Sequence, residues 1–142
     1  MRVMTTPTKT LRLPPGLRGE IDRIARRTRR SFSAVTQDLL EEALRMRSCP
    51  GIYFADEPAG REAKVAGTGL GVWEVIRDYL NGKRDEKVIR QSFPQLSEAQ
   101  VKACLLYYSR YPREIDAEIE ENTAVAREGG PLKLRPPGRH RA

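Results

Sequence analysis

The feature that most constrains this chain is one short strand pattern followed by two short helical patterns. Apolar and polar residues alternate over residues 8–13, T-K-T-L-R-L, and Pro14 follows directly. Pro14-Pro15 can begin a helix, and helical spacing of apolar residues runs through 17–25. Residues 28–30 break this pattern, Ser31 is expected to cap a second helix, and helical spacing returns through 35–44. A lone strand and two short amphipathic helices cannot close a core by themselves. Residues 6–47 are therefore expected to form a homodimer, or a higher even oligomer, through an antiparallel ribbon of two strands.

The outward face of such a ribbon would carry Thr8, Thr10 and Arg12. A two-stranded ribbon fits the major groove of DNA, where Thr and Arg side chains can contact base edges and phosphates. The charge agrees, because residues 1–50 hold 11 basic and 5 acidic residues, whereas residues 51–112 hold 9 and 8. Most of the net charge of +7 therefore belongs to the segment expected to bind double-stranded DNA.

Residues 6–47 resemble the ribbon-helix-helix family of DNA-binding proteins (CopG, MetJ and Arc type). The residues that carry the resemblance are T-K-T-L-R-L-P-P, L-R-G-E-I-D-R-I-A-R-R-T and R-S-F-S-A-V-T-Q-D-L-L-E-E-A-L. It implies base reading by the three outward ribbon residues and phosphate binding at the start of the second helix, by Arg29, Arg30, Ser31, Phe32 and Ser33. The chain departs from the family at Lys9, at Arg29 and at Ala34, where an apolar residue, a turn glycine and a glutamate are usual.

Residues 52–122 are expected to form a small, mainly helical domain with a minor β component. Short extended pieces are predicted at 52–54 and 63–66, and a helix is predicted from Val72 to Leu80, with Gly82 just beyond its end as a C-terminal glycine. Between them, G-T-G-L-G has the spacing G-x-G-x-G rather than the G-x-G-x-x-G of dinucleotide-binding loops. We therefore interpret these glycines as turn residues that need positive φ.

Three further helix starts are visible in this region. Asp85 is expected to cap a short helix, and Ser97 with Gln100 forms a capping box for the next one. Pro112 suits the first turn of a last helix. Trp73 and Cys104 fall on apolar faces, and both are predicted to be core residues.

Residues 56–117 resemble a second family, a small helix-turn-helix-like domain found in VapB-type antitoxins. The matching runs are A-G-R-E-A-K-V-A-G-T-G-L-G-V-W-E-V-I, F-P-Q-L-S-E-A-Q-V-K-A-C-L-L-Y-Y and Y-P-R-E-I-D. The resemblance implies a PIN-like ribonuclease toxin as a co-encoded partner, although Gly69 stands where the family often has Arg. The expected recognition helix, 98–110, offers only Lys102 and Arg110 against Glu98, which favours dimerisation or partner binding over DNA contact.

Residues 123–142 read as a flexible basic tail without a periodic core. Two apolar residues alternate there with two basic ones, which could anchor the tail along a partner: Leu132, Lys133, Leu134 and Arg135. The alternative is a solubilising tail without a partner.

The composition argues against enzymatic, metal and membrane functions. His140 is the only histidine, and the two cysteines, Cys49 and Cys104, form no ligand cluster, so we predict no catalytic triad, no metal and no cofactor. No apolar run is long enough to cross a membrane, and a cytoplasmic protein with reduced thiols is expected. The sequence thus predicts a mainly α, dimeric antitoxin and autorepressor. The alternatives are a stand-alone ribbon-helix-helix regulator without a toxin, or a protein-interaction adaptor.

Overall fold

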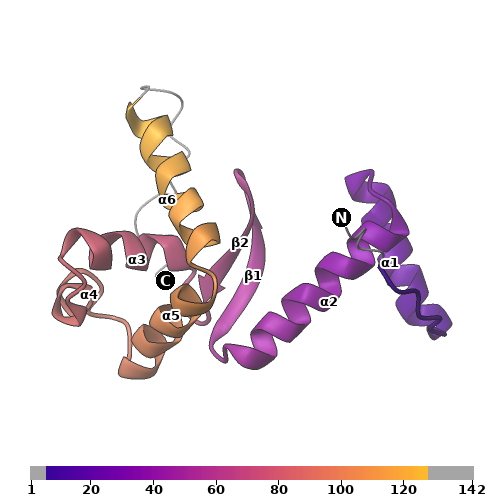
Figure 1. Cartoon of the computed structure of the whole chain (residues 1–142), viewed down its shortest axis with the longest axis horizontal. Coiled ribbons are helices and arrows are strands. Elements are labelled where there is room, and N and C mark those ends of the chain that lie inside the picture. Colours follow the sequence, from indigo (N-terminus) through magenta and orange to yellow (C-terminus); the bar gives the residue numbers. More distant parts are fainter. Residues whose placement is uncertain (1–5, 128–142) are drawn as a thin grey trace, which may run out of the picture. The chain divides into compact units, whose positions relative to one another are not determined.

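The computed structural model describes residues 6–127, and within them the chain is mainly helical with one small sheet. This confirms the predicted balance of many helices and minor β structure. In chain order the elements are α1 (Pro15–Thr28), α2 (Phe32–Ser48), β1 (Ile52–Glu57), β2 (Gly60–Val65), α3 (Val72–Asn81), α4 (Glu86–Ser92), α5 (Glu98–Arg110) and α6 (Pro112–Arg127) (Figure 1). The chain divides into two compact units between Ala43 and Leu44, inside α2.

Local signals in the sequence set the two helices of the first unit. Pro15 occupies the first turn of α1, where its missing N–H costs no hydrogen bond. Arg29 ends that helix in the left-handed conformation, with φ 56°. Ser31 then caps α2, because its Oγ accepts a hydrogen bond from the Ala34 N–H at 3.0 Å. These helix ends agree with the sequence prediction.

The first unit buries only a small apolar cluster. Ile21, Ala25 and Val35 are buried, and four half-buried side chains pack against them, namely Leu13, Ile24, Phe32 and Leu39. Large apolar side chains nearby stay exposed, among them Leu11 at 69% and Leu40 at 54%. One helical hairpin thus leaves much of its own apolar surface uncovered.

The predicted strand over residues 8–13 is not formed in the single chain. Residues 6–14 carry no regular secondary structure, and the sheet of the described chain contains only β1 and β2. The physical reason is the lack of a second strand, since the first unit offers no neighbour with which this segment could exchange backbone hydrogen bonds. The strand was predicted to form by pairing with a second copy, and that pairing stays a prediction.

The second unit begins with the β1–β2 hairpin. The strands pair antiparallel, from Ile52 opposite Val65 to Glu57 opposite Gly60. The loop after β2 turns back on the strand, because the Val65 N–H donates to the Leu70 carbonyl at 2.8 Å. Two of its glycines, Gly67 and Gly69, have positive φ of 84° and 73°, as predicted for turn glycines. For Gly71 the prediction was wrong, because this residue is the extended N-cap of α3 with a φ of −72°.

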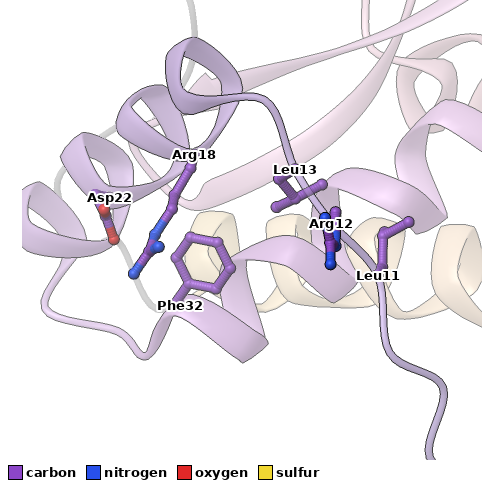
Figure 2. A pocket seen from close by; sticks show the side chains of 6 residues that line it. All are labelled: Leu11, Arg12, Leu13, Arg18, Asp22 and Phe32. Carbon is purple, nitrogen blue, oxygen red and sulfur yellow. The ribbon is translucent and has the colours of Figure 1, made fainter.

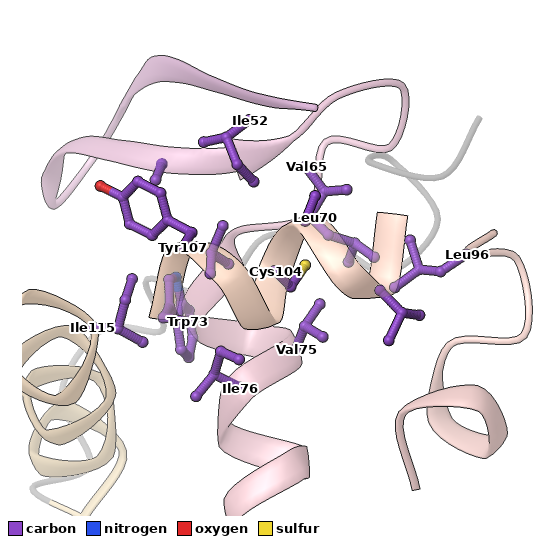
Figure 3. Close-up of a cluster of buried hydrophobic side chains, with 14 of the residues drawn as sticks. Ile52, Val65, Leu70, Trp73, Val75, Ile76, Leu96, Cys104, Tyr107 and Ile115 are labelled. Atoms are coloured by element: carbon purple, nitrogen blue, oxygen red, sulfur yellow. The ribbon is translucent and has the colours of Figure 1, made fainter. Parts of the chain in front are cut away.

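Helix α3 is the centre of the second unit and packs against β2, α4, α5 and α6. Figure 3 shows the resulting core, with apolar side chains from the hairpin and these helices directed toward one another. The fully buried members include Leu70, Val75, Ile76, Cys104, Tyr107 and Ile115. Trp73 is 5% exposed and Cys104 is fully buried, so both are core residues as predicted.

Two details of the second unit differ from the sequence prediction. Helix α6 runs to Arg127, although residues 123–142 were expected to be a flexible tail beyond a boundary at 122. Within this extension the Thr123 hydroxyl donates to the Ile119 carbonyl at 2.8 Å, so its polar group is satisfied inside the helix. Gly82 follows α3 as expected, yet its φ is −91°, and the positive φ values fall on Lys83 and Arg84.

Candidate nucleic-acid interface

The first unit contains an open groove beside the segment that was predicted to form a ribbon. Its volume is about 660 Å³, and its lining residues are Leu11, Arg12, Leu13, Arg18, Asp22 and Phe32. Figure 2 shows the segment Leu11–Leu13 on one side of this groove, with Arg18 extending from α1 toward Phe32 at the start of α2. The groove thus follows a stretch of backbone that has no strand partner.

The three residues predicted to read bases all lie on this segment. Thr8, Thr10 and Arg12 are exposed. Leu13 turns inward and packs on the small cluster around Ile21, so the alternation of the sequence is kept at this end of the segment. Leu11 was expected to share the inner face with Leu13, yet it remains exposed in the single chain.

The start of α2 presents backbone donors, as the sequence predicted. Ser31 satisfies the N–H of Ala34, while the N–H groups of Phe32 and Ser33, in the first turn, have no acceptor within the helix. Such donors and the positive end of the helix dipole favour an anion such as a phosphate. The Phe32 side chain itself packs inward, so only its backbone is available to a ligand.

The two arginines predicted beside this helix start differ in their surroundings. Arg29 is exposed and makes no ion pair with any described residue. Arg30 instead forms an ion pair with Asp38 on α2. This pair is exposed and its strength in water is small, of the order of 1 kcal/mol or less. Arg30 is thus partly neutralised, a contact that residue spacing alone did not reveal.

Several other arginines of the first unit extend the positive surface. Within the described chain Arg12, Arg18, Arg26 and Arg27 have no ion-pair partner, whereas Arg23 pairs with Glu20. Sequence reasoning missed Arg18 as a groove residue. In the sequence Arg18 appears only as a basic residue next to the apolar face of α1. Many surface arginines share this pattern, so it does not identify a groove residue.

A second polar cluster lies inside the second unit and was not predicted. The Arg45 guanidinium donates to the Tyr107 hydroxyl at 2.8 Å and to Glu114 at 2.6 Å, and it lies 4.1 Å from the centre of the Tyr111 ring. The Tyr107 hydroxyl donates to the other oxygen of Glu114 at 2.6 Å. Burial and the neighbouring carboxylate raise the pKa of Tyr107, so the phenol is held neutral. The cluster joins the last turns of α2 to α5 and α6.

The hairpin carries buried charges that are also paired. Lys64 forms an ion pair with Glu57 and is 3% exposed, while Glu62, at 8% exposed, accepts from the Trp73 indole N–H at 3.2 Å. Buried charges without partners would cost several kcal/mol each. These contacts explain why charged residues can occupy the buried part of β2.

The remaining predicted site lies in the tail. Leu132, Lys133, Leu134 and Arg135 fall outside the described residues. Residues 6–127 contain no group of three or more His, Cys, Asp or Glu side chains that could hold a metal ion. None of the helices described is both long and apolar enough to cross a membrane.

Comparison with known proteins identifies one similar segment. Residues 56–108 match the family model described as "Protein of unknown function (DUF433)", which covers the end of β1, all of β2, α3 and α4, and most of α5. No curated protein and no solved structure matches the chain. The similarity therefore marks this part of the second unit as a recurring domain and leaves the first unit to be interpreted from its own residues.

Proposed function

We propose that this protein is a homodimeric DNA-binding autorepressor of the antitoxin type. In this proposal the first unit pairs with a second copy through residues 8–13 and reads operator DNA. The second unit and the tail then neutralise a PIN-like ribonuclease toxin. The observation that carries the proposal is the incomplete first unit, in which apolar side chains and an unpaired backbone segment lie exposed next to an open groove.

The argument for a second copy rests on burial. Only Ile21, Ala25 and Val35 are buried in the first unit, while Leu11, Leu17 and Leu40 are at least half exposed. Fully burying one leucine contributes about 1.5–3 kcal/mol. A second copy would cover these side chains and would supply the strand that residues 8–13 lack. This arrangement would be the two-stranded ribbon of the ribbon-helix-helix family.

The argument for DNA rests on the polar side of the same segment. Thr8, Thr10 and Arg12 are exposed, and the start of α2 offers free N–H groups at Phe32 and Ser33. A ribbon in the major groove places its outward side chains on base edges, and a helix start binds the phosphate backbone. Dimerisation would double both sets of contacts.

The toxin part of the proposal rests on the second resemblance. Residues 56–117 are similar to a domain of VapB-type antitoxins, and α4, a short turn and α5 follow one another in the order of a helix-turn-helix. Lys102 on α5 is paired with Glu98, so little free charge is left on that helix for DNA. This supports a protein partner for the second unit.

Replacing Arg12 tests the DNA-binding part. We expect Arg12→Ala to weaken binding to the DNA upstream of the protein's own gene by about 5- to 150-fold, since a side chain that reads a base contributes about 1–3 kcal/mol. The matched control is Arg23→Ala, because Arg23 on α1 is already paired with Glu20. Fluorescence anisotropy at fixed salt measures both. Equal affinity of Arg12→Ala and the unchanged protein would contradict base reading by the ribbon.

Co-purification tests the toxin part separately. The full chain is co-expressed with the product of the adjacent gene, and the mass of the purified complex is measured. A stable complex that abolishes ribonuclease activity supports the antitoxin proposal. Specific DNA binding without any complex would leave a stand-alone regulator, and the absence of both would leave a protein-interaction adaptor.

A further inference from the structure

The second unit has a groove of its own that the proposed function does not use. Its volume is about 310 Å³, and its lining residues come from α3, the loop after it, α5 and the start of α6: Tyr79, Arg84, Leu105, Tyr108, Ser109 and Pro112. We propose that this groove binds a nucleotide of a single-stranded nucleic acid, with the base against the tyrosine rings and the phosphate at Arg84. The site is separate from the ribbon of the first unit.

The aromatic lining provides the surface for a base. Tyr79 and Tyr108 are half-buried, and both pack against the core of the second unit while lining the groove. The Tyr108 hydroxyl donates to Asp116 at 2.8 Å, which anchors the ring at its outer end. Leu105 lies one turn earlier on α5 and adds apolar surface. Every base has a flat π face, and stacking on such rings contributes about 1–3 kcal/mol per base.

Arg84 provides the cation. Its backbone N–H donates to the Tyr79 carbonyl at 2.9 Å, so the loop is tied to the end of α3. Lys83 and Arg84 both have positive φ, at 60° and 61°, a conformation that is uncommon for residues other than glycine. Residues held in this way are frequent at functional sites. The Arg84 side chain is exposed, and Arg84 lines the same groove as Tyr108.

The charge around the groove favours an anionic partner. Lys83, Arg110 and Arg113 are chain neighbours of lining residues, are exposed and make no ion pair with any residue from 6 to 127. Asp116 and Asp85 keep their negative charge, because they accept hydrogen bonds from neutral donors, the Tyr108 hydroxyl and the Lys87 N–H at 2.9 Å. The three cations together with Arg84 outnumber these two carboxylates, and an excess of unpaired cations favours a phosphate.

Two ligand classes carry negative charge into a groove of this kind. An acidic peptide supplies carboxylates but has no flat ring to fill the space between Tyr79, Leu105 and Tyr108. A single-stranded nucleic acid supplies both a phosphate and a base in each unit, and it can place an unstacked base in the groove, unlike a duplex. The combined lining therefore favours a nucleotide.

The experiment compares two labelled strands on the full-length protein. One is an oligothymidylate, and the other has the same number of phosphates but no bases. We expect the oligothymidylate to bind about 5- to 100-fold more tightly, measured by fluorescence anisotropy. Equal affinity for the two strands would overturn the proposal, because the protein would then bind the phosphates alone and not the bases. Displacement by polyglutamate as effective as by unlabelled oligothymidylate would overturn it in favour of an acidic peptide.

Variants locate the binding to this groove. Arg84→Gln should weaken oligothymidylate binding and reduce the slope of log affinity against log salt by about 0.7, the value for one phosphate contact on a single strand. Tyr108→Leu should remove the preference for the strand with bases, whereas Tyr108→Phe should keep it.

Lys102→Gln is the matched control, because Lys102 is already paired with Glu98. Arg12→Ala should leave the preference unchanged, which separates this site from the ribbon. An Arg84→Gln protein that binds as tightly as the unchanged chain would contradict the assignment.

Discussion

The guanidinium of Arg45, near the end of α2, donates a hydrogen bond of 2.8 Å to the hydroxyl of Tyr107, in the last turn of α5. Both side chains also bind Glu114, one on each carboxylate oxygen. Tyr107 is fully buried. Hydrogen bonds to charged groups contribute more than neutral ones, about 1.5–3 kcal/mol each. This relationship makes Tyr107 the central polar residue of the second unit.

Removing the hydroxyl should therefore cost stability without changing the packing of the ring. We expect Tyr107→Phe to lower the free energy of unfolding by about 1–3 kcal/mol, because it leaves a donor of Arg45 and an oxygen of Glu114 without their partner. Urea unfolding followed by circular dichroism measures the difference. Tyr108→Phe, on the same helix, is the matched control, since its hydroxyl is bonded to exposed Asp116 on α6, and its change should be below about 1 kcal/mol. A Tyr107→Phe protein as stable as the control would show that the cluster contributes nothing to stability.

The second unit should also lose stability in alkali. Burial raises the pKa of the Cys104 thiol from 9.0 to about 12, and burial with the Glu114 carboxylate raises the pKa of Tyr107. For both groups the pKa in the folded chain lies above the pKa in the unfolded chain. Their full contribution to the free energy of unfolding is therefore present below pH 9. Above it the unfolded chain releases the proton more easily, and stability falls as the pH rises through the folded pKa.

Chemical unfolding at a series of pH values checks whether the free energy of unfolding falls in this way. Between pH 9 and 11 we expect each group to lower the free energy of unfolding with a limiting slope of about 1.4 kcal/mol per pH unit. Cys104→Ala should give a shallower slope than the unchanged protein, whatever its stability at pH 7. Identical slopes for the two proteins would show that the thiol does not titrate on unfolding.

The sequence predicted those features that depend on neighbouring residues. Ser31, Ser97 and Asp85 cap α2, α5 and α4 as expected, because each hydroxyl or carboxylate reaches a backbone N–H only two or three residues away. The turn glycines Gly67 and Gly69 follow from the same local geometry. Several helix starts and two turn glycines were therefore visible without a structure.

Contacts between distant residues were not predictable in this way. Arg45 and Glu114 look like ordinary surface charges in the sequence, and only the packing of α2, α5 and α6 places them together. The groove residue Arg84 was equally hidden, because its role depends on Tyr108, which follows much later in the chain. The strand over residues 8–13 is a different case, since it was predicted to pair with a second copy and stays a prediction.

The sequence predicts a helix-end role for Gly82, because a helix end often needs positive φ. In the structure the glycine is required by close packing instead. Its φ is negative, but a Cβ at this position would lie 2.4 Å from Cγ2 of Val88. Since Val88 packs directly against the glycine, Gly82→Ala should destabilise the protein by about 1–3 kcal/mol. Gly16→Ala in α1 is the control, because a Cβ there meets no atom within 4 Å and should be neutral or stabilising. Thermal unfolding of the two variants compares them, and equal melting temperatures would contradict close packing at Gly82.

Replacing an exposed leucine of the first unit with a charged residue should dissociate the proposed dimer. Leu40→Glu changes a side chain that is 54% exposed in the single chain, so an isolated chain should tolerate it with little loss of stability. If Leu40 is covered by a second copy, the buried charge should dissociate the dimer. Leu106→Glu on α5, at 37% exposed, is the matched control in the second unit and should leave the assembly unchanged.

The molar mass of the full-length protein in solution tests the central claim most directly. Sedimentation equilibrium at micromolar concentration should give twice the chain mass of 16.1 kDa, or a higher even multiple, and Leu40→Glu should reduce it to a single chain. A protein that remains at 16.1 kDa at every concentration would contradict the account, because residues 8–13 would then have no second strand with which to form a DNA-reading ribbon.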